Sequence, residues 1–234
     1  MKIFSDERLL GLGVISGTVS RHTGSGREAQ NVKKFFDTLD IDSANILGLR
    51  QVHGAHIVPI ISGEDLKNYR KTAMHEGDAW LLGRAGCGCM ILTADCAPLY
   101  VWNDRGICVG LAHCGWRGVA AGLPRKIAED IKIRAGKNVR LCAYIGPHIN
   151  ACCFEVREDA AGQFGQRALV KKGGKIFVDL AAEITAQLLS AGADAKDIRR
   201  ECACNCTMCN KEDFFSYRRD KTRDTMISFI YKPA

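Results

Sequence analysis

The chain has 234 residues, of which 47% are hydrophobic and 25% charged, and its formal net charge is +7. This length and composition are typical of one large globular domain or two small ones, which need no disulfide staples to fold. No apolar run reaches the roughly 18 residues of a membrane span, and no run of about five like charges marks a nucleic-acid tail. The N-terminus carries acidic residues and no apolar signal segment, so we expect a cytoplasmic protein.

Strands and helices are expected to alternate irregularly along the chain, without a repeat or a linker that would divide it. Short strand-like stretches open the sequence, and a loop with glycine and serine follows at 20–26. The first helix is predicted at 31–39, where four apolar residues recur at helical spacing. Strands are predicted at 46–52, 56–61, 89–92, 99–102, 107–113, 141–145 and 226–231, and further helices at 118–135 and 180–191. This order indicates a mixed α/β layered fold rather than a bundle or barrel.

Twelve cysteines require an explanation in a chain without a signal segment. Reduced thiols are expected there, either buried or bound to metal. Segment 202–209 holds four of them within eight residues, which leaves two interpretations open, a second metal site or reduced surface thiols. Cys152 and Cys153 are expected to pack. Four cysteines inside apolar runs are expected to behave as small hydrophobic side chains: Cys87, Cys89, Cys108 and Cys142.

Three short segments each place a potential metal ligand beside turn residues, at or after the end of a predicted strand. They are Gln-Val-His-Gly at 51–54, Thr-Ala-Asp-Cys-Ala-Pro at 93–98 and Ala-His-Cys-Gly-Trp-Arg-Gly at 112–118. Two imidazoles and one thiolate suit a zinc site that keeps its fourth position open. Their separations match no local zinc signature, however, and buried histidine and cysteine are common. Composition alone therefore favours structural roles.

These segments, together with those at 143–149, 152–156 and 214–220, resemble the YfiH family, also labelled polyphenol oxidase or laccase-domain proteins. The resemblance extends from about Gly13 to Tyr231. It implies a single domain spanning 1–234, folded as a layered α/β/β/α sandwich related to cysteine-based deamidase toxins. It also implies a purine nucleoside phosphorylase that deaminates adenosine, with zinc held by His53, Cys96 and His113 and with Arg117 in the same pocket.

Two segments depart from the family pattern. The loop at 19–31 is shorter than usual, and 221–226 lacks the glycine usual between threonine and arginine, so no contact near Arg223 is carried over. The resemblance also implies the partners, which are a purine nucleoside and inorganic phosphate. The sequence does not rank adenosine, inosine, guanosine and methylthioadenosine as substrates.

Phosphorolysis needs phosphate beside the anomeric carbon, and a planar guanidinium binds phosphate through paired hydrogen bonds. Arg117 is the first candidate for this role and Arg218 the second. The alternative for Arg218 and Arg219 is a surface ion pair with Asp220. Asp95 is expected to orient the site because it precedes a ligand.

Ser16, Cys114 and His148 are further candidates for lining the pocket. His56 lies three residues after His53, an offset that points to the opposite face of a strand. We therefore interpret it as a surface residue rather than a ligand.

Three other chemistries can be weighed from residue counts and motifs. Multicopper oxidases need on the order of ten histidines, and this chain has six, which excludes laccase chemistry in a monomer. Cytidine-type deaminases use H-x-E and P-C-x-x-C motifs, which are absent, so any deamination needs another proton carrier. Two alternatives stay open. One is an amide hydrolase that uses zinc or a Cys96 activated by His113 and edits cell-wall precursors, a role that the resemblance to the family also suggests. The other is a non-enzymatic nucleotide-binding protein that uses its basic charge.

Overall fold

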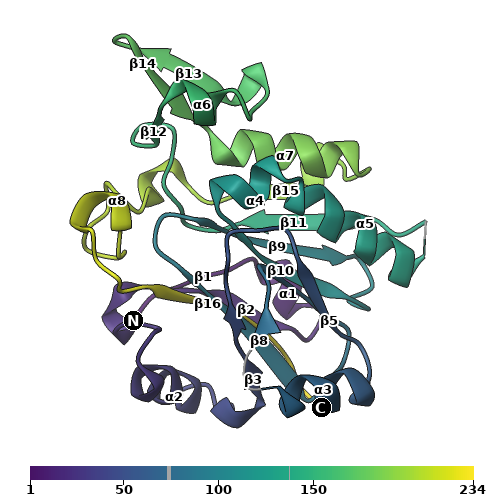
Figure 1. Ribbon diagram of the computed structural model, residues 1–234. Coiled ribbons are helices and arrows are strands. Elements are labelled where there is room, and N and C mark those ends of the chain that lie inside the picture. The colour runs from purple at the N-terminus through teal and green to yellow at the C-terminus, as the bar shows by residue number, and fades with distance from the viewer. Residues whose placement is uncertain (73–74, 137) are drawn as a thin grey trace.

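The computed structural model describes residues 1–72, 75–136 and 138–234, and two β-sheets stacked face to face form its centre (Figure 1). The first sheet has the order β1-β2-β16-β8-β3. Its strands are β1 (Ile3–Phe4), β2 (Ile15–Val19), β16 (Met226–Lys232), β8 (Cys87–Thr93) and β3 (Ile46–Leu47). Strand β16 pairs antiparallel with both β2 and β8, so the last strand of the chain lies at the centre of this sheet.

The second sheet has six strands in the order β15-β11-β9-β10-β7-β5. They are β15 (Ile198–Arg200), β11 (Leu141–Ile145), β9 (Ala97–Asn103), β10 (Val109–Cys114), β7 (Ala79–Leu82) and β5 (Ile57–Ile60). Every residue of β7, β9, β10 and β11 is buried. This sheet is therefore covered on both faces, and alternate residues of a strand enter different layers.

The alternation of side chains separates two hydrophobic cores. Trp80 and Tyr100 pack with Ile91 of β8 in the core between the sheets. Their neighbours Leu81 and Leu99 instead join the core beneath the helices.

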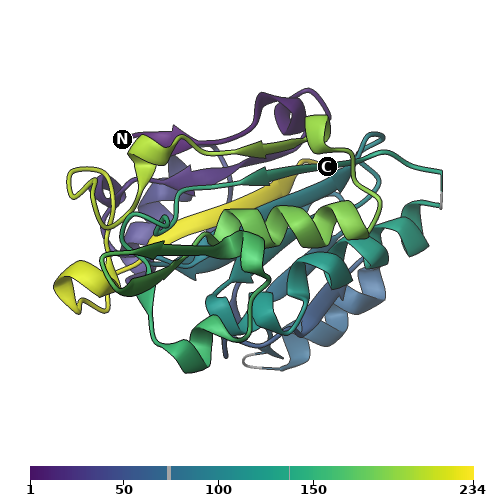
Figure 2. The same cartoon turned by 90° about the horizontal axis from the view of Figure 1, so that it is seen from above.

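Helices cover the outer faces of both sheets (Figure 1), and Figure 2 looks onto the helices that lie on the six-stranded sheet. Helices α5 (Leu123–Ala135) and α7 (Leu180–Ser190) pack on the six-stranded sheet through residues such as Ile127 and Ile184. On the other side, α2 (Ala29–Asp37) places Phe35 and Phe36 against Phe229 of β16, with ring centroids 5.2 and 5.4 Å apart. The predicted mixed α/β layering is confirmed.

The remaining elements lie around this sandwich. A three-stranded sheet in the order β12-β14-β13 extends beyond α7 (Figure 1), and β4 pairs with β6. None of the helices in the described ranges has the length and hydropathy needed to cross a bilayer. The other bounds are α1 (Glu7–Leu10), α3 (Gly63–Lys71), α4 (Trp116–Ala120), α6 (Glu158–Ala161), α8 (Tyr217–Asp220), β4 (Leu49–Arg50), β6 (His75–Glu76), β12 (Glu155–Val156), β13 (Leu169–Lys172) and β14 (Lys175–Val178).

Two predicted elements are each divided in the structure. The helix expected at 118–135 is α4 followed by α5, because Gly122 adopts a left-handed φ of 81° that ends the first helix. The strand expected at 46–52 is β3 and β4, which belong to different sheets. Residues 51–54 form a loop that follows β4, and His53 lies in this loop.

Candidate metal centre

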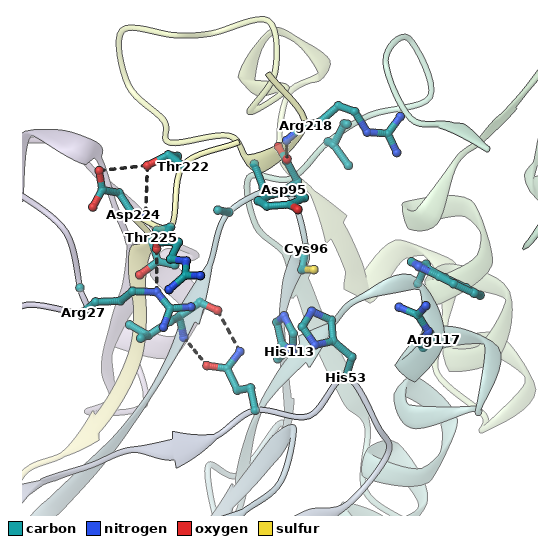
Figure 3. A pocket seen from close by; sticks show the side chains of 18 of the residues that line it. Arg27, His53, Asp95, Cys96, His113, Arg117, Arg218, Thr222, Asp224 and Thr225 are labelled. Atoms are coloured by element: carbon teal, nitrogen blue, oxygen red, sulfur yellow. Dashed lines mark hydrogen bonds between the residues drawn. The ribbon is translucent and has the colours of Figure 1, made fainter. Parts of the chain in front are cut away.

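His53, Cys96 and His113 converge from three separate parts of the chain (Figure 3). His53 follows β4, Cys96 lies in the turn between β8 and β9, and His113 is in β10. Their ligand atoms all lie within 4.8 Å of one another. The two imidazole rings are nearly perpendicular, with centroids 4.8 Å apart. Two ring nitrogens and one sulfur at this spacing fit the donor set of a zinc ion.

The electrostatics of the cluster favour an ionised thiol. Burial alone would raise the pKa of Cys96, but the charge of His113 and hydrogen bonds from both imidazoles outweigh burial and hold it at about 6. Burial likewise opposes protonation of His113, yet Cys96 and Asp78 raise its pKa to about 9. Cys96 is therefore available as a thiolate ligand at neutral pH.

Asp78 holds two of the three ligands, although no sequence motif marked it as a candidate. Its buried carboxylate accepts a hydrogen bond from His113 Nδ1 at 2.9 Å. It also accepts the backbone N–H groups of Val52, His53 and Gly54 at 3.3, 2.9 and 2.7 Å. Burial opposes ionisation of Asp78, but these contacts lower its pKa. Because Nδ1 of His113 is engaged, Nε2 is left as the ligand nitrogen.

Backbone strain marks both loops that deliver ligands. His53 has a φ of 59° and Asp95 a φ of 84°, values that residues other than glycine seldom adopt. The carboxylate of Asp95 accepts hydrogen bonds from Thr207 Oγ1 and the backbone N–H of Arg218, both at 2.7 Å. Asp95 therefore orients the chain around Thr207 and Arg218 beside the cluster, without a hydrogen bond to either imidazole.

Gly115 is confined by the ligands. A Cβ at this position would lie 3.0 Å from Cδ2 of His53 and 3.2 Å from the sulfur of Cys96. Its φ of −68° is ordinary, so close packing against the ligands is what favours glycine here.

The three ligands lie in the wall of a cavity of about 1480 Å³. Both arginines proposed from sequence, Arg117 and Arg218, line it (Figure 3). The guanidinium of Arg117 is exposed and lies 4.4 Å from the centre of the Trp116 ring. The complete set of arginines in the lining is Arg27, Arg50, Arg117, Arg157, Arg218 and Arg223. The lining also contains four carboxylates, so its arginines outnumber its acidic residues by six to four, and this positive balance suits an anionic substrate. These acidic residues are Asp95, Glu155, Asp159 and Asp224.

The two neighbouring arginines of α8 have different partners. Arg219 pairs with Asp220 at 2.7 Å, as the surface ion-pair interpretation expected. Arg218 instead donates to the carbonyl of Glu155 at 2.9 Å and lies 5.4 Å from the centre of the Phe154 ring. Its side chain is therefore held at the cavity wall rather than in that ion pair.

Comparison with known proteins assigns the chain to a family. A sequence model of the family described as multi-copper polyphenol oxidoreductase laccase matches residues 19–232. The chain belongs to this family. The similar proteins include purine nucleoside phosphorylase YfiH of Escherichia coli (strain K12), 31% identical over 208 residues, or 86% of this chain and 79% of that protein. Adenosine deaminase RL5 from an unknown prokaryotic organism is 28% identical over 193 residues, covering 77% and 72%.

Solved structures of similar proteins share the fold. The crystal structure of YlmD from Geobacillus stearothermophilus superposes with a TM-score of 0.83 at 26% identity, over 95% of this chain and 93% of that one. The crystal structure of YfiH from Bacillus licheniformis gives 0.81 at 26% identity, over 93% and 92%. The resemblance to the YfiH family found in the sequence is thus confirmed.

The donors of this laccase-family member do not match the copper apparatus in the family description. Among the described residues, the histidine, cysteine and carboxylate groups spaced for a metal are His53–Cys96–His113 and a set of four cysteines. Neither supplies the many imidazoles of a trinuclear copper cluster. The structure therefore agrees with the histidine count in giving no support to laccase chemistry.

Three expected contacts receive no support from the structure. Neither Ser16 nor His148 is among the described residues that line the cavity. Ser16 lies in β2, paired with Ile230 of the central strand. His148 is buried, and its Nδ1 lies 2.8 Å from the carbonyl of Gly146, which holds the ring within the protein. Cys114 is also absent from this lining and packs in the core beneath the helices.

The structure adds cavity residues on the side of β16, where no contact was predicted. Arg27 donates from Nε to the carbonyl of Arg223 at 2.6 Å, and both residues line the cavity. Thr222 Oγ1 donates to Asp224 at 3.1 Å in the same wall (Figure 3). No sequence motif marks Arg27 as a cavity residue, because its position depends on a hydrogen bond to a residue 196 positions later in the chain.

Proposed function

We propose that this protein is a zinc-dependent purine nucleoside phosphorylase. It would convert adenosine, inosine or guanosine and phosphate to the free base and ribose 1-phosphate, with adenosine deamination and methylthioadenosine phosphorolysis as further activities. The observation that carries the proposal is a His2Cys donor set opening on an arginine-lined cavity. The names of the similar proteins, purine nucleoside phosphorylase and adenosine deaminase, support it. We further propose that residues 1–234 form one catalytic domain that acts in the cytoplasm.

In this proposal His53, Cys96 and His113 hold the zinc ion. When bound, zinc supplies a Lewis acid that polarises an oxygen of phosphate or water. Arg117 and Arg218 bind phosphate, and their guanidinium groups stabilise its charge as the glycosidic bond breaks. The Asp95 carboxylate positions the backbone at Arg218, and Asp78 keeps His113 in a single orientation.

The purine base would be recognised by the aromatic part of the cavity. Trp116, Phe154 and Tyr217 all contribute to its wall. Aromatic faces stack on purine rings whatever the exocyclic groups are. This agrees with an enzyme that accepts several purine nucleosides.

Incubation with substrates tests the proposal. The zinc-loaded protein would be given adenosine, inosine, guanosine or methylthioadenosine, with and without phosphate, and the products separated by chromatography. We expect the free base to form only when phosphate is present, together with ribose 1-phosphate, or with methylthioribose 1-phosphate when the substrate is methylthioadenosine. His113→Ala should abolish turnover, whereas the matched variant His56→Ala, whose exposed ring lies outside the donor set, should keep it. Failure to release base from all four nucleosides, or full activity in His113→Ala, would contradict the proposal.

One observation favours a second candidate, an amide hydrolase with a cysteine nucleophile. Cys96 is ionised near neutral pH beside His113, the pairing used by cysteine hydrolases. Zinc analysis and alkylation separate the two, because a thiolate bound to zinc is protected from iodoacetamide whereas a free nucleophile reacts rapidly. The third alternative, a nucleotide-binding protein, predicts salt-sensitive binding without turnover.

A further inference from the structure

A second group of sulfur atoms lies outside the candidate metal centre. Cys152 and Cys153 are in the turn after β11, and Cys206 and Cys209 precede α8. The sulfur of Cys209 lies 3.2 Å from that of Cys153 and 3.8 Å from that of Cys152, and Cys152 and Cys153 are 3.5 Å apart. All four sulfurs lie within 4.8 Å of one another. None of the twelve cysteines, all within the described ranges, forms a disulfide.

These separations fit a single ion surrounded by four thiolates. Zinc–sulfur bonds of about 2.3 Å in a tetrahedron place the sulfurs about 3.8 Å apart. An iron–sulfur cluster interposes several iron and sulfide ions, which holds its cysteines further from one another. A tetrahedral site with four sulfur donors and room for one ion favours zinc.

The protein backbone supports a thiolate at the buried corner of this group. The N–H of Asn150 donates to the sulfur of Cys206 at 3.4 Å, and Cys206 is fully buried. Cys206 and Cys209 have the C-x-x-C spacing with which one turn presents two thiolates to an ion.

The other cysteines of segment 202–209 do not belong to the group. Cys202 and Cys204 are exposed, and the sulfur of Cys202 accepts a hydrogen bond from the backbone of Cys204 at 3.3 Å. A site made by this segment alone, one of the possibilities left open by the sequence, is therefore not formed. Two of its cysteines join a pair more than 50 residues earlier in the chain.

We propose that Cys152, Cys153, Cys206 and Cys209 bind one structural zinc ion. Four protein ligands complete its coordination, so this ion has no open position for substrate. Binding displaces the thiol protons to solvent and joins the turn after β11 to the segment before α8.

Both joined segments reach the wall of the large cavity. Thr207, which follows Cys206, donates to Asp95 at 2.7 Å. The carbonyls of Thr207 and Met208 accept hydrogen bonds from Arg219 at 2.9 and 3.0 Å. Phe154, which follows Cys153, lies beneath Arg218. The second ion would therefore hold the part of the wall that contains Asp95 and Arg218.

Metal counting on the full chain tests this site without reference to activity. Elemental analysis of dialysed protein should find about two zinc ions per chain. Cys209→Ser and Cys206→Ser should each lower the count to about one. The matched double variant Cys202→Ser/Cys204→Ser should keep both ions, because these exposed thiols lie outside the group. His113→Ala should also lose one ion, but from the other site.

Cobalt substitution identifies which site remains. A cobalt ion bound by four thiolates gives much stronger thiolate-to-cobalt charge transfer than one bound by the single thiolate of the His2Cys site. We expect the strong signal in wild type and His113→Ala, and a fall to the level of one thiolate in Cys209→Ser. Cys209 is exposed, so this variant should fold even if the buried Cys206→Ser does not. The proposal is overturned if wild type carries only the ion lost in His113→Ala. It is also overturned if anaerobically purified protein has a Cys153–Cys209 disulfide in place of the second ion. Neither result depends on nucleoside turnover.

Discussion

The carboxylate of Asp78 accepts one hydrogen bond from Nδ1 of His113 and another from the backbone N–H of His53, both at 2.9 Å from the same oxygen. A single buried side chain thus fixes the imidazole of one proposed ligand and the strained backbone of another. Removing its charge should weaken zinc binding even though Asp78 does not belong to the donor set.

Asp78→Asn is expected to weaken zinc affinity about 10- to 100-fold, the usual cost of losing a hydrogen-bond partner of a ligand. The amide retains the volume of the carboxylate but has one fewer acceptor for the four N–H donors. Competition with a chromophoric chelator would measure the affinity. The exposed control Asp104→Asn should bind zinc as wild type does. An unchanged affinity in Asp78→Asn would show that the loop at His53 is fixed by other contacts.

Gly115→Ala should also weaken zinc binding, for a steric reason. The added methyl would press on the ring of His53 and the sulfur of Cys96, so one of them must move. We expect the thiolate-to-cobalt band of the His2Cys site to shift and the zinc affinity to fall by about tenfold or more, because ligand geometry controls affinity. Gly11→Ala is the matched control, since its new methyl would meet only carbonyl oxygens at ordinary contact distances of 3.6 and 3.7 Å. Equal affinity in the two variants would contradict this account.

The sequence predicted the layers well because they follow from local periodicity. The helix at 180–191 and the strand at 141–145 coincide closely with α7 and β11, where apolar patterns and Gly192 set the limits. The break between α4 and α5 was missed although Gly122 and Pro124 carry a signal for it, because the apolar pattern continues on both sides of them. A glycine followed closely by a proline is typical of one helix ending and another beginning.

The site was predictable only in part, because its residues are related through the fold. The motifs that resemble the YfiH family indicated His53, Cys96 and His113, and the structure places them together. Asp78 and Arg27 carry no recognisable motif, and their roles depend on hydrogen bonds to distant segments. The pairing of Cys152 and Cys153 with Cys206 and Cys209 likewise required the turn after β11 to meet the segment before α8.

Asp6 is buried and forms an ion pair with the half-buried Arg8, and this pair should make stability depend on acid pH. Arg8 donates to Asp6 through Nη2 at 2.7 Å and to the carbonyl of Ala143 in β11 at 3.1 Å. Burial opposes ionisation of Asp6, but the hydrogen bonds and charge of Arg8 lower its pKa. A folded pKa below the unfolded value stabilises the protein above about pH 4, and this contribution is lost as pH falls through the folded pKa.

Asp6→Asn should therefore lower the free energy of unfolding by about 2–3 kcal/mol at pH 7, because Arg8 keeps its charge without a partner. The difference from wild type should be constant between about pH 5 and 7 and shrink below about pH 4. Urea titrations at several pH values would measure it. Asp37→Asn removes the exposed pair with Lys33 and should have little effect. A difference that does not change with pH would mean that the charge of Asp6 is not what stabilises the fold.

Arg117→Ala tests the proposed phosphate contact. Losing a charge-assisted hydrogen bond worth about 1.5–3 kcal/mol should raise the KM for phosphate by about 10- to 100-fold. The KM for the nucleoside should change much less if Arg117 contacts only phosphate. Arg117→Lys keeps the charge but not the planar fork, so it should recover part of the loss.

Arg125→Ala is the control for Arg117→Ala. It removes an exposed arginine of α5 outside the cavity lining and should leave both KM values unchanged. Initial rates with each substrate varied in turn would separate the two KM values. A rise in the nucleoside KM alone would place Arg117 beside the base or ribose, and Arg218 would then become the main phosphate ligand.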